Sequence, residues 1–91
     1  MRYAYHQAFL RATERLSSRE SDALLRAVGK FQQATEAGQW PRGLGITHLR
    51  RDYFEFRIDL RLRVIYRRSP ALIEYVLYGS HEDVRRFLKS L

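Results

Sequence analysis

The sequence predicts an α+β fold: an N-terminal helical hairpin packed on a twisted antiparallel sheet of three to four strands, then a short C-terminal helix. Residues 53–66 carry an apolar or aromatic side chain at every even position, and that period of two is typical of a strand. Two capping boxes of the form S-x-x-D/E, at residues 17–20 and 80–83, mark helix starts on either side of this run.

The segment before the sheet predicts a short strand and two helices. Residues 2–5 (RYAY) are a candidate edge strand, and residues 7–16 place apolar side chains at helical spacing. The second helix begins after Ser17, and Gly38 is placed to end it. Because the break between the helices is a residue or two, they should lie as an antiparallel hairpin. Residues 39–45, with Trp-Pro and two glycines, predict a loop.

The run from 53 to 66 is too long for one strand and must turn within itself. A two-residue loop at 59–60 would set Ile58 opposite Arg61 and would place arginine in the core. A three-residue loop at 59–61 keeps one face apolar, because it pairs Ile58 with Leu62, Phe56 with Val64 and Phe54 with Tyr66. The other face then collects Tyr53, Glu55, Arg57, Arg63 and Arg67.

Residues 71–79 predict a third strand, with Ile73, Tyr75 and Leu77 on the core face. Tyr78 would then lie on the opposite face, near Arg57 and Arg63. The last segment predicts a helix that begins after Ser80, with His81 in its first turn and Val84, Phe87, Leu88 and Leu91 on one face.

Composition indicates one domain, residues 1–91, with a strong and local positive charge. The formal net charge is +7, and residues 42–68 hold eight arginines against three acids, which is +5 of it. Such a cluster fits nucleic acid or an acidic protein segment as partner. The chain has no cysteine, and it shows neither a signal peptide nor a transmembrane run, so we expect a cytoplasmic protein without a membrane partner.

Two stretches resemble a known family. Residues 53–66 have the form Y-x-E-x-R-I-x-x-x-x-R-V-I-Y, and residues 77–84 read LYGSHEDV. Together with the predicted order of elements, they resemble the RelE/ParE toxin superfamily of bacterial type II toxin–antitoxin systems. The resemblance implies a cognate acidic antitoxin that wraps the toxin. It also implies one of two activities: RelE-like members cut mRNA on the ribosome without a metal or cofactor, and ParE-like members inhibit DNA gyrase as binding modules.

The ribonuclease branch implies roles for particular residues. Arg63 matches the strand arginine at the scissile phosphate, and His81 matches an arginine or histidine two residues after the glycine that ends the last strand. Cleavage by the 2′-hydroxyl needs a base, an acid and a cation on the developing charge. We therefore assign Arg63 as catalytic cation, His81 as acid or base, and Glu55 as proton acceptor. The residues expected to bind RNA are Arg50, Arg51, Tyr53, Arg57, Arg61, Arg67, Tyr78 and Phe87.

Several alternatives stay open at the level of sequence. His81 could simply begin a helix, and Glu55 could be an ion-pair partner for a neighbouring arginine. His81, Glu82 and Asp83 are adjacent at a helix start and do not converge, so no metal site is expected. The activity is either an mRNA endoribonuclease that acts with the ribosome or a gyrase inhibitor, and a toxin fold that only binds its partner is a third option.

Overall fold

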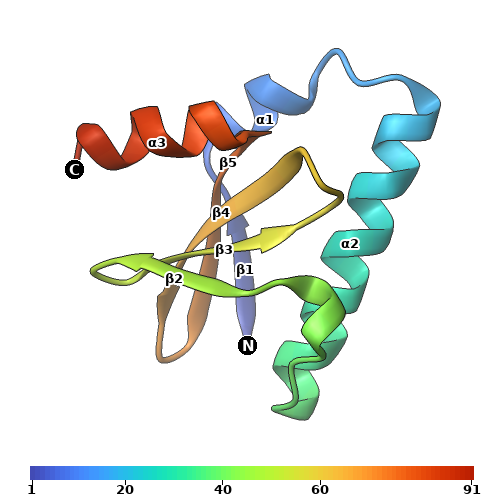
Figure 1. Cartoon of the computed structure of the whole chain (residues 1–91). Helices are drawn as coiled ribbons and strands as arrows, with labels where there is room; N and C mark the ends of the chain where they lie inside the picture. Colours follow the sequence, from blue (N-terminus) through green and yellow to red (C-terminus); the bar gives the residue numbers. More distant parts are fainter.

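The computed structural model describes all 91 residues as a five-stranded sheet with three α-helices and one 3-10 helix (Figure 1). The α+β prediction is confirmed. The elements are, in chain order, β1 (Arg2–Tyr5), α1 (Gln7–Thr13), α2 (Ser18–Ala37), the 3-10 helix η1 (Arg42–Leu44), β2 (Thr47–Arg50), β3 (Tyr53–Arg57), β4 (Leu62–Ser69), β5 (Leu72–Ser80) and α3 (His81–Lys89).

The sheet is mixed, which corrects the expected antiparallel sheet of three to four strands. Its strand order is β1-β5-β4-β3-β2, and β1 pairs parallel with β5 while every other pair is antiparallel. The candidate edge strand RYAY is confirmed as β1. Strand β2 was not predicted, because its sequence, THLR, has no alternating apolar pattern and lies at the exposed edge.

The predicted helical hairpin is wrong in its geometry. Helix α1 ends at Thr13, and residues 14–17 separate it from α2, so the break is longer than the sequence indicated. Phe9, the buried residue of α1, packs its ring 5.7 Å from that of Tyr75 on β5. In Figure 1, α1 crosses the top of the sheet and α2 descends along its side. Phe31 of α2 also packs its ring against Tyr75, at 6.1 Å, so the two helices contribute to one core although they do not run as a hairpin.

Helix α2 begins and ends where its sequence predicts. The Ser17 hydroxyl accepts a hydrogen bond from the Glu20 backbone N–H (3.2 Å), and the Glu20 carboxylate accepts one from the Ser17 N–H (3.0 Å). At the other end Gly38 adopts a left-handed conformation (φ 69°) that returns its N–H to the last turn. Because these caps set the first and last residues of α2, they also help to determine which of its side chains face the core.

The predicted register of the β3–β4 hairpin is confirmed. Phe54 lies opposite Tyr66 and Phe56 opposite Val64. The loop is closed by Asp59, whose side chain accepts hydrogen bonds from the backbone N–H groups of two residues, Arg61 and Leu62 (2.8 Å each). These bonds lower the pKa of the Asp59 carboxyl below its usual range. Because the loop has an odd number of residues, the even-numbered apolar residues of both strands lie on one face of the sheet and the odd-numbered residues lie on the other.

Each face of the sheet carries an apolar cluster. The helix face, which includes Phe54, Phe56, Val64 and Tyr66, packs on α1 and α2 around Phe31. The α3 face, which includes Tyr53, Glu55, Arg63 and Ile65, is covered in part by α3, and its cluster is centred on Ile65, Val76 and Val84. Arg63 therefore shares its face of the sheet with a second small core.

A β-bulge in β5 reverses the predicted faces of its last residues. Tyr66 pairs with Tyr75, whereas Ile65 pairs with Leu77, so Val76 is the extra residue. Beyond the bulge Leu77 lies on the α3 face, and Tyr78, opposite Val64, is buried on the helix face. The predictions that Leu77 joins the main core and that Tyr78 stands near Arg57 and Arg63 are both wrong.

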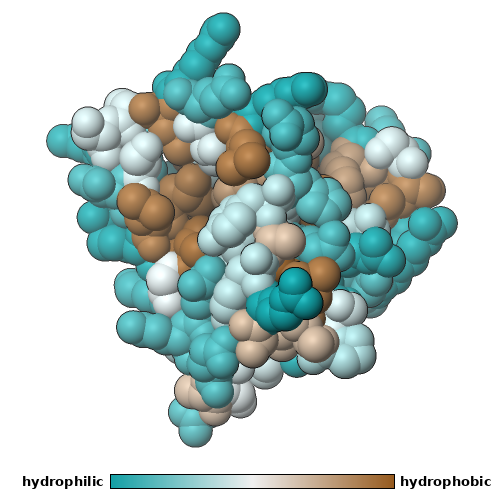
Figure 2. All heavy atoms as spheres, turned by 180° about the vertical axis from the view of Figure 1, so that it is seen from behind, coloured by the Kyte–Doolittle hydropathy of each residue, from teal (hydrophilic) through white to brown (hydrophobic).

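The surface shows no large continuous apolar area from behind. In that view the hydrophobic residues form separate patches between hydrophilic ones (Figure 2). None of the helices combines the length and the hydrophobicity that crossing a membrane requires. The large hydrophobic residues that remain exposed are Met1, Tyr5, Leu10, Leu25, Trp40 and Leu60.

Candidate functional site

The centre of the α3 face holds an ion pair between Arg63 and Glu55. Arg63 lies on β4, directly opposite Arg57 on β3 and Gly79 on β5. Its Nη1 is 3.6 Å from Oε1 of Glu55, and the two side chains are only 17% and 8% exposed. The buried carboxylate of Glu55 therefore restricts the position of the Arg63 guanidinium.

This ion pair is incompletely hydrogen-bonded. Glu55 Oε2 and Arg63 Nε are both buried and neither has a hydrogen-bond partner. A guanidinium carries five N–H donors, and a contact of 3.6 Å to one carboxylate oxygen leaves most of them unused. Arg63 thus keeps the capacity to bind an anion such as a phosphate.

Gly79 makes room for the polar group that starts α3. A Cβ at Gly79 would lie 2.5 Å from Oδ2 of Asp83, so a side chain there would collide with the cap. Asp83 Oδ2 accepts hydrogen bonds from the Ser80 N–H (2.7 Å) and hydroxyl (2.9 Å). These bonds hold the pKa of Asp83 below its usual range. The predicted capping box is confirmed, and α3 begins beside Arg63.

His81 is the first residue of α3 and is exposed. It follows Gly79, the β5 partner of Arg63, by two residues, so both side chains belong to the same end of the sheet. No hydrogen bond or ion pair engages His81 within the chain. Its imidazole is therefore accessible to a bound molecule.

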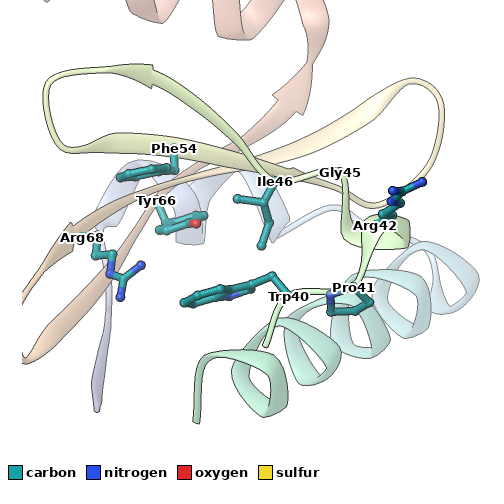
Figure 3. A pocket seen from close by; sticks show the side chains of 8 residues that line it. All are labelled: Trp40, Pro41, Arg42, Gly45, Ile46, Phe54, Tyr66 and Arg68. Carbon is teal, nitrogen blue, oxygen red and sulfur yellow. The ribbon is translucent and has the colours of Figure 1, made fainter. Parts of the chain in front are cut away.

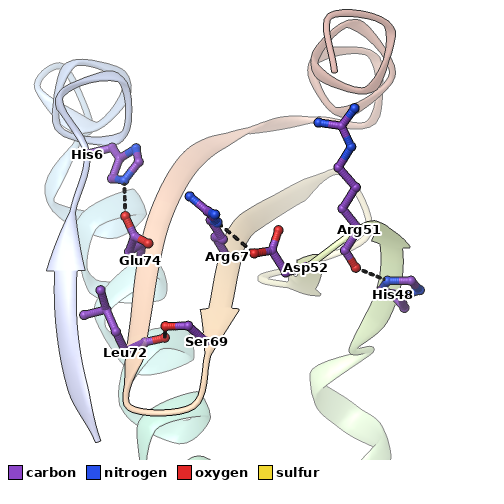
Figure 4. Close-up of polar contacts among 8 residues, drawn as sticks. All are labelled: His6, His48, Arg51, Asp52, Arg67, Ser69, Leu72 and Glu74. Carbon is purple, nitrogen blue, oxygen red and sulfur yellow. Dashed lines mark hydrogen bonds and ion pairs between the residues drawn. The ribbon is translucent and has the colours of Figure 1, made fainter.

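Three of the arginines expected to bind RNA take part in local contacts. Arg67 bonds Asp52 through Nε (2.8 Å), and this contact lowers the pKa of the Asp52 carboxyl (Figure 4). Arg50 donates from Nη1 to the carbonyl of Leu88 (2.9 Å), near the end of α3. The carbonyl of Arg51, whose φ is 54°, accepts a hydrogen bond from His48 Nε2 (Figure 4).

The remaining RNA-binding candidates are spread over both faces. Tyr53 and Phe87 pack edge to face, with ring centroids 5.1 Å apart, and so attach α3 to the sheet. Arg57 is exposed at the end of β3 and lies across Gly45. Arg61, in the β3–β4 loop, borders a pocket on the helix face together with Tyr78. The structure brings Arg63 and Glu55 together on the α3 face, close in sequence register to His81. The side chain of Arg57 extends instead towards Gly45, η1 and α2, and Tyr78 lies on the other side of the sheet.

The helix face carries a groove that the sequence did not predict. This groove, here called the Trp40 groove, has a volume of about 530 Å³ (Figure 3). A lone tryptophan followed by proline in a loop was the available signal, since a large aromatic residue that is not needed for the core is often a contact residue. The lining residues are Trp40, Pro41, Arg42, Gly45, Ile46, Phe54, Tyr66 and Arg68.

No three His, Cys, Asp or Glu side chains come together in a group that could hold a metal ion.

The order of the strands and the placement of the three helices are similar to those of solved toxin structures. No family model and no curated protein sequence matches the chain. Among solved structures, it is similar to the Escherichia coli DinJ–YafQ toxin–antitoxin complex, with a TM-score of 0.72 and 14% identity over 92% of this chain and 98% of the other.

Two further structures give the same result. The YoeB/ParE toxin of Agrobacterium tumefaciens has a TM-score of 0.67 and 17% identity, with 89% of this chain and 99% of the other covered. The RelB–RelE antitoxin–toxin complex of Methanococcus jannaschii has a TM-score of 0.66 and 8% identity, with 92% and 96% covered. At these identities the likeness establishes the fold.

Proposed function

We propose that the chain is the toxin of a type II toxin–antitoxin system and that it cuts mRNA on the ribosome without a metal. The toxin fold supports the first part of this proposal. The second part rests on one observation: Arg63 is held by Glu55 on the α3 face, opposite the glycine that precedes the exposed His81 by two residues.

The proposed reaction is attack of an RNA 2′-hydroxyl on the adjacent phosphate. The 2′-oxygen forms a bond to phosphorus, the bond to the 5′-oxygen breaks, and a cyclic phosphate results. A base removes the 2′-proton and an acid delivers a proton to the 5′-oxygen. Arg63 would bind the charge that develops on the phosphoryl oxygens, and His81 would transfer one of the two protons.

Glu55 fits a positioning role better than the proton-accepting role assigned from sequence. Its side chain is 8% exposed and faces Arg63, so an RNA hydroxyl has little access to it. A carboxylate that fixes a guanidinium removes the cost of ordering that side chain during the reaction. We therefore propose that Glu55 acts through Arg63, and that His81 carries the proton transfer on the accessible side.

Purified protein offered programmed ribosomes in EDTA tests the ribonuclease proposal. Because no step of the proposed reaction uses a metal, we expect the message to be cut, with discrete new 5′ ends that primer extension can map. Naked mRNA is the control and should be cut far less. An intact message would reject the ribonuclease, and DNA breaks that accumulate in expressing cells would favour the alternative, a ParE-like gyrase inhibitor.

The proposed partner is a cognate antitoxin with an acidic segment that folds on contact. The net charge of +7 and the exposed arginines support this proposal. Affinity for the cognate antitoxin should fall roughly tenfold between low and high NaCl, because charges at the rim of an interface are screened over about 8 to 10 Å at physiological ionic strength. Calorimetry across a salt series measures this, and a flat affinity would contradict it.

A further inference from the structure

The Trp40 groove lies on the face of the sheet opposite Arg63. Its sheet residues are Phe54, Tyr66 and Arg68, which belong to the helix face, whereas Arg63 belongs to the α3 face. The other wall comes from the loop between α2 and β2. A molecule in the groove would therefore leave the proposed catalytic residues uncovered.

The groove combines an apolar middle with a cation at each end. Figure 3 shows Ile46 and the aromatic rings between Arg68 at one end and Arg42 at the other, where the Arg42 side chain points outward from the groove. Tyr66 is 3% exposed and forms part of the floor, while Trp40 is 40% exposed. The guanidinium carbon of Arg68 lies 5.2 Å from the centroid of the Trp40 ring. One side of the tryptophan is thus already occupied by a cation.

The loop that carries Trp40 is fixed at both of its ends. Gly38 caps α2 in a left-handed conformation immediately before the loop. After it, Leu44 is buried and Gly45, with φ 59°, returns its N–H to the carbonyl of Arg42 (3.0 Å). A groove whose walls are fixed before binding loses little conformational entropy when a ligand enters.

We propose that the Trp40 groove is a docking site for an acidic peptide segment of a protein partner. The segment places one bulky apolar side chain between Trp40 and Phe54, and its carboxylates pair with Arg42 and Arg68. This inference rests on the proposed function in one respect, because an antitoxin is the expected source of such a segment. The volume of about 530 Å³ is ample for one large side chain and its neighbouring backbone.

The charges and the floor favour a peptide over RNA. A strand of nucleic acid is bound by a basic groove that follows its backbone and by successive aromatic rings that stack on its bases, whereas this groove has two separated arginines and a single Trp40 ring with one side occupied by Arg68. Burial raises the pKa of Tyr66 to about 12. The Tyr66 hydroxyl therefore stays neutral, and it adds no negative charge that would repel a carboxylate.

Trp40 is the only tryptophan of the chain, so its fluorescence reports directly on the groove. The probe is the blocked peptide EEEELFEEE, which has no tryptophan, titrated into the full-length protein. We expect a saturable change in Trp40 emission. The peptide EEEEAAEEE has the same charge and should bind about tenfold more weakly or worse, because it lacks the side chain that the apolar middle would bury.

Variants of the groove test its apolar middle and its arginines separately. Arg68→Gln removes one end charge and should weaken the EEEELFEEE peptide about two- to fivefold. Ile46→Ser should weaken binding of the EEEELFEEE peptide by a similar or larger factor, because it removes part of the apolar middle of the groove. It should leave the contribution of the arginines to binding unchanged. Arg15→Gln removes an equal charge at an exposed position outside the groove and should leave binding unchanged. Circular dichroism confirms that each variant is folded.

Three results would overturn the inference. They are an absence of any change in Trp40 emission, equal affinity for EEEELFEEE and EEEEAAEEE, and tighter binding of a uridine oligonucleotide than of either peptide. The ribosome assay is independent of these titrations. An intact message together with selective peptide binding would reject the ribonuclease and retain the docking site. A cut message together with no selective peptide binding would retain the ribonuclease and reject the docking site.

Discussion

Arg63→Ala is expected to cut mRNA on programmed ribosomes about 10²- to 10³-fold more slowly than the unmodified chain. The guanidinium is held by Glu55 at 3.6 Å before any substrate binds, so it can stabilise the charge of the transition state without being reordered. His81→Ala should slow cleavage about 10²- to 10⁴-fold, because it would remove the group proposed to transfer a proton. Rates of appearance of the new 5′ ends, and growth arrest after induction, measure both effects.

The burial of Arg63 determines the controls for this experiment. Its side chain is 17% exposed, and alanine would leave the carboxylate of Glu55 buried without its cation, which destabilises the fold by about 1–3 kcal/mol or more. Arg63→Lys keeps a positive charge but loses the planar fork that can bind phosphate through two parallel bonds. We expect Arg63→Lys to fold with a near-normal urea midpoint and still to lose most of its activity.

His81 permits a cleaner test because it is exposed and makes no internal contact. His81→Gln should leave the urea midpoint unchanged and slow cleavage about as much as His81→Ala. Arg11→Ala removes an exposed arginine of α1 whose side chain forms no hydrogen bond or ion pair and should change neither rate nor stability. Growth arrest that persists in His81→Gln, with message intact and DNA broken, would reject the ribonuclease and favour a gyrase inhibitor.

The parity of the sequence was sufficient to predict the β3–β4 hairpin. Glu55 and Arg63 are both odd-numbered, and only a loop with an odd number of residues keeps the even-numbered apolar residues together on one face. The same argument placed Glu55 and Arg63 on one face. It could not give their burial, because α3 and Tyr53 form a second apolar cluster on that face.

The faces of β5 could not be predicted in the same way. Residues 71–79 read ALIEYVLYG, and apolar or aromatic residues occupy both parities at its end. Either Leu77 or Tyr78 could face the core, and the bulge at Val76 decides the matter. Bulges leave little trace in composition, so the placement of Tyr78 depended on tertiary pairing.

Strand β2 and the parallel pairing of β1 depend on contacts that are distant in sequence. The residues THLR gain their strand conformation from hydrogen bonds to β3, and RYAY gains its direction from β5. Neither segment is long enough to specify a partner by its own pattern. The Trp40 groove was hidden for the same reason, because its two walls come from the α2–β2 loop and from β3 and β4.

Phe31→Ala should cause a large loss in the free energy of unfolding. Phe31 is 1% exposed, and its ring lies 4.5–4.6 Å, centroid to centroid, from the rings of Phe56 and Tyr66. Truncation of a buried phenylalanine costs about 3–5 kcal/mol. A domain of this size is stabilised by only about 5–15 kcal/mol, so the variant should lose a large fraction of its free energy of unfolding.

Leu25→Ala is the matched control for Phe31→Ala, since Leu25 lies on the same helix and is 67% exposed. Its free energy of unfolding should change by less than about 0.5 kcal/mol. Urea denaturation followed by the fluorescence of Trp40 measures both variants, because this single tryptophan contacts Arg68 of the sheet from the loop that follows α2. A loss below about 1 kcal/mol in Phe31→Ala would mean that α2 is not anchored on the sheet through this ring.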